Sequence, residues 1–399
     1  MKSIEVEKIE SHNVLNPTVI KLGFVSFFAD IASEMLYPIT PIFLTAVLGA
    51  SMSSLGLIEG VAEAIASLLK TYSGSWSDQI SKRKPFIITG YLLAAIAKPI
   101  VGFSSSWAQV LGARALDRTG KGIRSAPRDA LLSDSVDPKQ IGAAFGWHRA
   151  MDTAGAAIGP LFAITLLTAN AADLRPLYMW ALIPGLISVL ILFFIHEPKP
   201  VKKENQKWQN PIFAWSKFDF SFKKYLFSWG IFSVANSSDV FLLMKAKSAG
   251  ISTVSVILIY CLYNLVYAAS SPYLGKLSDK IDRRFILAGG LFVFVLVYLG
   301  FSVANEDWQY WALFGIYGLY MGATDGVGKA LTIDLVPKEL KATALGLLGT
   351  VTGVCTLVAS ITAGLIWDHA GSMWTFLFGA FGAALAAILI LTAPHRKIN

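Results

Sequence analysis

Long apolar segments recur along the whole chain, separated by short polar ones. Twelve of them reach about 20 residues, enough for a helix to cross the hydrocarbon core of a bilayer. The segments are too long for strands and show no alternation, and only helices or closed barrels satisfy their backbone groups in lipid. The pattern therefore predicts an all-α polytopic membrane protein. Its helices are expected at 18–47, 53–77, 85–105, 107–134, 139–169, 174–196, 224–246, 252–277, 285–304, 308–335, 339–368 and 372–393.

Composition supports this class and excludes others. The 399 residues are 54% hydrophobic and 15% charged, where a soluble chain is about a quarter charged, and the mean hydropathy is +0.56. The 2 Cys, Cys261 and Cys355, both fall inside predicted spans, so a disulfide scaffold is excluded. Residues 1–17 are polar and mixed in charge, and we expect no cleaved signal peptide there.

The net charge of +8 has a simple origin. Basic residues gather in alternate connections, around 82–84, 199–224, 276–284 and 338–341, whereas the opposite connections offer little beyond Arg175 and Lys247. By the positive-inside rule both termini are expected in the cytoplasm, with the chain in the cell (inner) membrane. Because these loops account for most of the basic excess, nucleic acid is not an expected partner.

The chain contains an internal repeat. The stretch from Gly74 to Asp78, followed by Lys82 and Arg83, returns about 200 residues later as Gly275 to Asp279, followed by Arg283 and Arg284. Val136-Asp137-Pro138-Lys139 returns as Val336-Pro337-Lys338. These matches predict two six-helix lobes of the same orientation, 1–196 and 224–399, joined by a cytoplasmic linker at 197–223.

Twelve helices in a six-plus-six repeat resemble the major facilitator superfamily over the whole chain. The loop after the second span carries that family's Gly-x-x-x-Asp motif twice, although Ser81 and Asp282 replace its second glycine. The segment 139–169 carries Gly155-x-x-x-Gly159-Pro160, which resembles the antiporter motif, and Pro38-x-x-Pro41 is similar to efflux members. The resemblance implies a transporter of the prokaryotic proton-coupled efflux branch. It also implies a gate, for which we expect Gly74, Asp78, Arg83, Arg124, Gly155, Gly159, Pro160, Gly275, Asp279 and Arg283.

The segment 107–134 carries an unusual stripe of charge. With a step of about 100° per residue, Arg114, Asp117, Arg118, Lys121, Arg124 and Arg128 fall within an arc of roughly 120°. Such a stripe cannot face lipid, so it lines a wet cavity or meets acids on other helices. In the family this span lines the central cavity, and Arg118 matches its conserved arginine. An alternative is that Arg124, Arg128 and Asp129 belong to the cytoplasmic gate and bind nothing.

Acidic residues also lie inside the predicted spans, and their charge is opposite to that of the basic stripe. Asp30 and Glu34 lie four apart on one helical face, and Asp30 is roughly 18 Å from the start of its span. Two carboxylates this close should raise one another's affinity for protons. Together with Asp152 and His148 they are the expected proton-coupling residues; His148 is alternatively a structural partner. The remaining embedded polar residues are expected in the substrate cavity with Arg118 and Lys121. They are Glu59, Glu63, Asn236, Asp239 and Asp325.

No enzyme, cofactor or metal site is expected, because the chain has no P-loop, no His-Glu-x-x-His and no Cys-x-x-Cys. The leading hypothesis is a monomeric secondary transporter that exchanges a small solute for protons, in the direction of export. Two alternatives stay open. One is an uptake carrier for an anionic solute or metal complex, and the other is a non-transporting receptor or assembly factor with the same fold.

Overall fold

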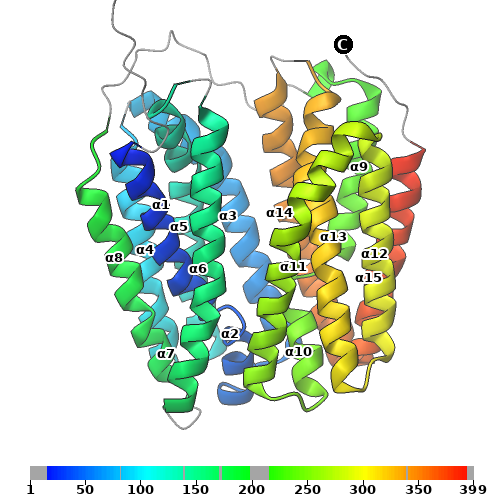
Figure 1. Ribbon diagram of the computed structural model, residues 1–399. Coiled ribbons are helices and arrows are strands. Elements are labelled where there is room, and N and C mark those ends of the chain that lie inside the picture. The colour runs from blue at the N-terminus through cyan, green and yellow to red at the C-terminus, as the bar shows by residue number, and fades with distance from the viewer. Residues whose placement is uncertain are drawn as a thin grey trace, which may run out of the picture.

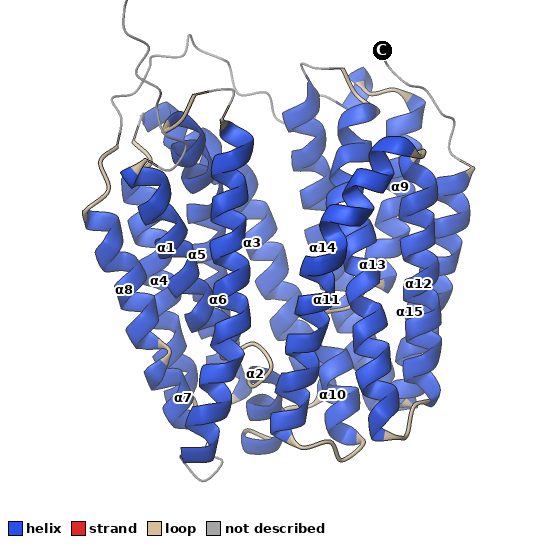
Figure 2. Ribbon diagram, viewed as in Figure 1, coloured by secondary structure: helices blue, strands red, loops and turns tan. Residues whose placement is uncertain are grey.

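The computed structural model describes residues 16–80, 82–137, 140–169, 173–197, 215–337 and 340–392. Within these ranges the chain is helical apart from short turns and connections, and no strand occurs (Figure 2). All twelve predicted spans are present. Nine of them are continuous helices: α3 (Met52–Ile80), α4 (Lys84–Phe103), α5 (Trp107–Asp134), α6 (Ile141–Ala169), α11 (Thr253–Lys280), α12 (Arg283–Val303), α13 (Asp307–Asp334), α14 (Lys341–Ala370) and α15 (Ser372–Leu391).

Proline explains two of the three interrupted spans. The first span consists of α1 (Pro17–Glu34), α2 (Thr40–Ile42) and a π-helical turn, η1 (Phe43–Val47). Its break contains Pro38, which has no N–H to continue the helix. The sixth span breaks between α7 (Arg175–Trp180) and α8 (Leu182–Phe193). There Pro184 lacks the N–H that would bond the carbonyl four residues earlier.

The seventh span breaks without a proline. It divides into α9 (Phe220–Ala235) and α10 (Val240–Ser248), so it begins at Phe220 rather than at the predicted residue 224. The intervening sequence is Asn-Ser-Ser-Asp, and such side chains compete for backbone hydrogen bonds in non-helical conformations. The break places Asn236 and Asp239 on an open turn inside the membrane-spanning part of the chain.

The helices form two lobes, α1 to α8 and α9 to α15 (Figure 1). The start of α1, the end of α8, the start of α9 and the end of α15 lie on the same side, at the top of Figure 1. Across the lobes α3 packs against α14, and α6 packs against α11. At the opposite end of the molecule α2 contacts α10, so the two lobes also meet there.

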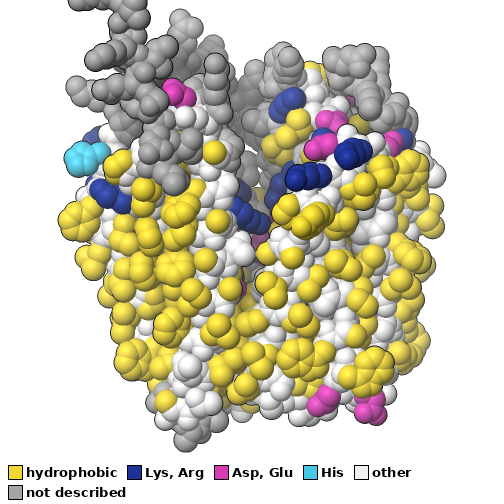
Figure 3. All heavy atoms as spheres, viewed as in Figure 1, with side chains coloured by type: hydrophobic (Ala, Val, Ile, Leu, Met, Phe, Trp, Pro, Cys, Tyr) yellow, Lys and Arg dark blue, Asp and Glu magenta, His cyan; other side chains and the backbone are white. Residues whose placement is uncertain are grey.

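Length and composition alone identify nine helices of the described residues as able to cross a membrane. The three spans that fall short are those of α1, α5 and α13. For α1 and α5 their polarity has a structural reason, because charged residues of both line the space between the lobes. On the face shown in Figure 3 the side chains over the middle and lower part of the molecule are largely apolar, as a lipid-facing surface must be.

Candidate functional site

A cavity of about 370 Å³ lies between the two lobes. The space-filling view shows the molecular surface hollowed between the lobes in its upper half, with basic side chains along the hollow (Figure 3). Six acids and five bases line this cavity: Asp30, Glu34, Glu59, Glu63, Asp117 and Asp239, with Lys98, Arg114, Arg118, Lys121 and Arg124. The cavity is therefore polar and rich in both signs of charge.

Asp117 is the centre of a buried charge network on the first lobe. Its carboxylate lies 3.5 Å from Lys98 Nζ, 3.7 Å from Arg118 Nε and 3.9 Å from Arg114 Nη1. Arg114 also donates a 2.6 Å hydrogen bond to Glu59. The pair of Lys98 with Asp117 joins α4 to α5, and the pair of Arg114 with Glu59 joins α5 to α3, so the network links these three helices.

Arg124 belongs to the same stripe of bases on α5, but it forms no ion pair with another described residue. Its side chain is 7% exposed, and its guanidinium lies over the Tyr91 ring at 3.8 Å from the centroid. Its Nε and Nη1 are buried and make no hydrogen bond in the described structure. The close approach of α4 makes this position possible, since a side chain at Gly90 would meet the Arg124 β-carbon at 2.6 Å.

The acids of α1 have different partners. Glu34 accepts a 2.6 Å hydrogen bond from the Tyr260 hydroxyl of the second lobe. Asp30 lines the cavity, yet neither a hydrogen bond nor an ion pair joins it to another described residue. Lys121 and Glu63 also line the cavity without an ion pair within the described part of the chain.

His148 and Asp152 lie together on α6, with His148 Nδ1 at 3.5 Å from Asp152 Oδ2. His148 Nε2 and Asp152 Oδ1 are buried and have no hydrogen-bond partner among the described atoms. The antiporter-like glycines pack α6 onto α1: a side chain at Gly155 would meet the Asp30 β-carbon at 3.1 Å, and one at Gly159 would meet the Met35 nitrogen at 2.9 Å. Pro160 lies in the same helix.

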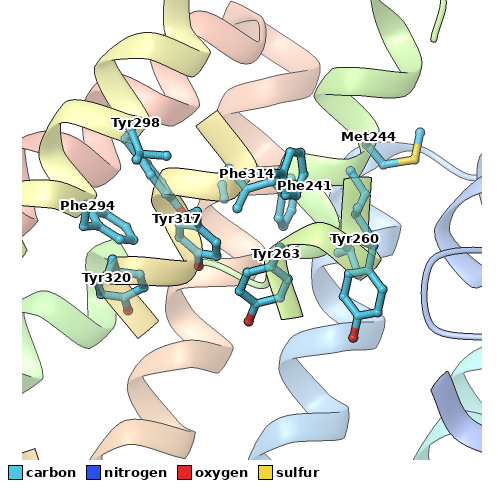
Figure 4. Close-up of a cluster of buried hydrophobic side chains, with 14 of the residues drawn as sticks. Phe241, Met244, Tyr260, Tyr263, Phe294, Tyr298, Phe314, Tyr317 and Tyr320 are labelled. Atoms are coloured by element: carbon cyan, nitrogen blue, oxygen red, sulfur yellow. The ribbon is translucent and has the colours of Figure 1, made fainter. Parts of the chain in front are cut away.

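The second lobe presents Asp239 to the cavity, supported by tyrosines. Asp239 accepts hydrogen bonds from Tyr317 at 2.7 Å and from Tyr263 at 3.3 Å. Asn236 donates to the Tyr320 hydroxyl at 3.3 Å. Figure 4 shows that these three rings and that of Tyr260 come from α11 and α13 and turn their hydroxyls the same way.

Asp325 lies outside the lining of this cavity. It pairs with Lys329 at 2.6 Å, accepts a hydrogen bond from Tyr267 at 3.0 Å, and lies 3.9 Å from Arg149 of the first lobe. Arg149 also donates to the Tyr267 hydroxyl at 3.2 Å. The cluster thus joins α6 to α11 and α13 across the lobe interface.

The two repeated loops carry matching ion pairs. Arg83 lies 3.0 Å from Asp134, and Arg283 lies 2.8 Å from Asp334. Each pair ties the loop after the second helix of a lobe to the end of its fourth helix. Asp279 pairs with Arg283 at 3.0 Å, and the side chain of Asp78 lies outside what the structure describes. At Gly74 an added β-carbon would lie 3.1 Å from that of Ala126, whereas Gly275 has open space beside it.

Most of the predicted cavity residues do meet in one place. Glu59, Glu63, Arg118, Lys121, Asn236 and Asp239 line the cavity, and so do Asp30, Glu34 and Arg124. Asp325, His148 and Asp152 do not. Lys98 was not among the predicted cavity residues. It is an ionisable residue inside the predicted span 85–105, which is the same signal that identified Asp30. Arg149 was missed because its partners belong to the other lobe.

No group of three or more metal-ligating acids, histidines or cysteines occurs within the described ranges. A family model for the Major Facilitator Superfamily matches residues 22–260 and again 225–398. The two matches together span nearly the whole chain.

Among relatives, the chain is 36% identical over 389 residues to an uncharacterized MFS-type transporter of Methanocaldococcus jannaschii, covering 96% of each protein. It is also 26% identical over 323 residues to the multidrug resistance protein MdtG of Enterobacter lignolyticus, covering 78% of this chain and 75% of that protein.

Solved structures show the same fold. The nucleoside transporter NupG superposes with a TM-score of 0.78 at 13% identity, covering 96% of this chain and all of that one. A bacterial homolog of the human lysosomal transporter Spinster, in an inward-facing and occupied conformation, gives 0.74 at 16% identity, covering 94% and 96%.

Proposed function

Since the chain belongs to the major facilitator superfamily, a family of multi-pass membrane transporters, we propose that it moves a small solute by alternating access and couples this to protons in the direction of export. The two lobes rock about the central cavity, which faces one side of the membrane at a time. The charged cavity takes the solute, and the carboxylates of α1 take the proton.

The observation that carries proton coupling is the unpaired carboxylate of Asp30. It lines the cavity, and no cation within the described residues forms an ion pair with it. An embedded carboxylate without such a partner is costly as an anion and can be neutralised by a proton instead. Asp152 and His148, on the helix that Gly155 packs against α1, offer a second acceptor and a second donor nearby.

Two observations support export. The relative from Enterobacter lignolyticus is named a multidrug resistance protein, and α6 carries the antiporter-like glycines.

The matching pairs Arg83–Asp134 and Arg283–Asp334 support a gate between rigid lobes. Because each pair lies within one lobe, it holds the helix ends of that lobe together during the movement. For Asp78 we propose a contact with the start of α14, whose helix dipole favours an anion. This contact would close the cytoplasmic side of the transporter.

A second candidate function is uptake of an anionic solute, and Arg124 is the observation that favours it. A buried guanidinium with two unpaired N–H groups is a site for an anion. Uptake and export differ only in which face of the membrane supplies the solute.

The test uses purified full-length protein in liposomes with an imposed pH gradient, screened against organic anions, cations and zwitterions. We expect solute to move uphill against the proton flow, and Asp30→Asn to abolish the uphill step while solute exchange persists. Asp307→Asn, an exposed acid at the start of α13, is the matched control. Gradient-driven transport that survives in both Asp30→Asn and Glu34→Gln would refute the proton assignment. Transport of solute in the same direction as protons would support uptake.

A further inference from the structure

The cavity has two kinds of charged side chain. Arg114, Arg118, Lys98, Glu59 and Asp117 are joined by ion pairs within the first lobe. Other charged groups that line the cavity form no ion pair among the described residues. In the first lobe these include Lys121 and Arg124 on α5 with the acids Asp30 and Glu63, and in the second lobe it is Asp239, at the break between α9 and α10.

The basic end of the cavity is built around Arg124. More than nine-tenths of this side chain is buried, and the face of the Tyr91 ring fixes the plane of its guanidinium. A hydrogen bond to a charged group is worth about twice a neutral one, so two unused guanidinium N–H groups leave a strong demand for an anion. Lys121 lies one helical turn earlier on α5 and lines the same cavity.

The acidic end is built around Asp239. It is the first residue before α10, a position where Asp usually caps the helix, but its side chain makes no capping hydrogen bond. Instead the Tyr317 and Tyr263 hydroxyls hold its two oxygens from behind. No described cation forms an ion pair with it, so the carboxylate faces the cavity with its charge uncompensated.

We propose that the cavity binds a small zwitterion, whose anionic group is held by Arg124 and Lys121 and whose cationic group is held by Asp239. Such a ligand supplies a counter-charge to Arg124 of the first lobe and to Asp239 of the second lobe at once, which neither a simple anion nor a simple cation can do. Because its two ends contact different lobes, binding also links the lobes. The inference rests on the proposed transport function only in naming this ligand as the carried solute.

The binding test uses purified full-length protein in detergent and no gradient. The probes are a series of ω-amino acids of increasing chain length, each compared with the alkanoate and the alkylamine of equal length, and binding is measured by calorimetry. We expect one chain length to bind at least about tenfold more tightly as the ω-amino acid than as either analogue. Equal affinity of an analogue, or no binding by any ω-amino acid, would overturn the proposal.

Two variants test the assignment of each end. Arg124→Gln should abolish the preference over the alkylamine, and Asp239→Asn should abolish the preference over the alkanoate. Lys276→Gln and Asp307→Asn, exposed charges away from the cavity, are the matched controls and should keep both preferences. Because affinity ratios are compared, a general loss of stability does not imitate the result. Unchanged ratios in Arg124→Gln and Asp239→Asn contradict the assignment.

The outcome is independent of the transport experiment. Zwitterion binding without a response to a pH gradient would reject proton coupling alone. Gradient-driven transport of another solute, without zwitterion preference, would reject this inference alone.

Discussion

Asp117 offers the sharpest test of how the first lobe is held together. Its carboxylate is the common partner of Lys98, Arg114 and Arg118, at distances from 3.5 to 3.9 Å. The change Asp117→Asn keeps the size and shape of the side chain and removes only its charge. Lys98 and Arg118 would then lose their ion-pair partner, whereas Arg114 would keep Glu59.

The expected loss of stability can be bounded from these distances. At an effective dielectric constant near 20, each contact contributes about 4–5 kcal/mol of Coulomb energy. The cost of burying Asp117 offsets most of this sum, so the pairs add little net stability. Leaving buried cations unpaired is costlier, and we expect the free energy of unfolding to fall by about 3–5 kcal/mol.

The measurement is denaturant unfolding of the purified protein in detergent micelles, followed by tryptophan fluorescence. Asp279→Asn is the control, because Asp279 pairs with Arg283 while 67% exposed and should cost less than about 1 kcal/mol. Adding Lys98→Met to Asp117→Asn should restore part of the stability, since it removes one of the unpaired cations. Equal losses in Asp117→Asn and Asp279→Asn, or no recovery in the double variant, would refute the reasoning.

Two further changes test the helix contacts around the cavity. Gly155→Val would bring a side chain against the Asp30 β-carbon and the backbone of α1. This change should abolish transport in liposomes. Gly146→Val is the control and should keep transport, because Gly146 has open space around it. Arg149→Gln removes a contact to the second lobe and should lengthen spin-label distances between α6 and α11 at the open end; an unchanged distance distribution would contradict this.

The sequence predicted the number and order of the spans because hydrophobic length is a local property. It did not predict the break in the seventh span, since the four polar residues from Asn236 to Asp239 fit within an apolar stretch of ordinary length. Their hydrogen-bond partners include the tyrosines of α11 and α13 and Ser360 of α14, all far away in the chain. Pro38 and Pro184 were visible signals for the other two breaks.

The site was predicted one lobe at a time. Helical spacing placed Arg114, Arg118 and Arg124 on one face, and these three residues line the cavity. Spacing could not tell which of them are paired, because Lys98 and Glu59 reach them from other helices. The internal repeat also contains Asp134 and Asp334, which are 200 residues apart and pair with the loop arginines Arg83 and Arg283.

The distribution of polar contacts between the lobes bears on how the protein moves. Every ion pair among the residues that line the cavity joins two residues of the first lobe. Polar contacts across the lobes include hydrogen bonds of Glu34 with Tyr260 and of Asp368 with the backbone amides of Met52 and Ser53, together with the contacts of Arg149 to Tyr267 and Asp325. A rocking movement must break the contacts between the lobes and can leave the ion pairs within the first lobe intact. Buried ion pairs within a lobe, with hydrogen bonds and an exposed ion pair between the lobes, are therefore what a bistable carrier needs, and a bridging zwitterion would add its own link between the lobes.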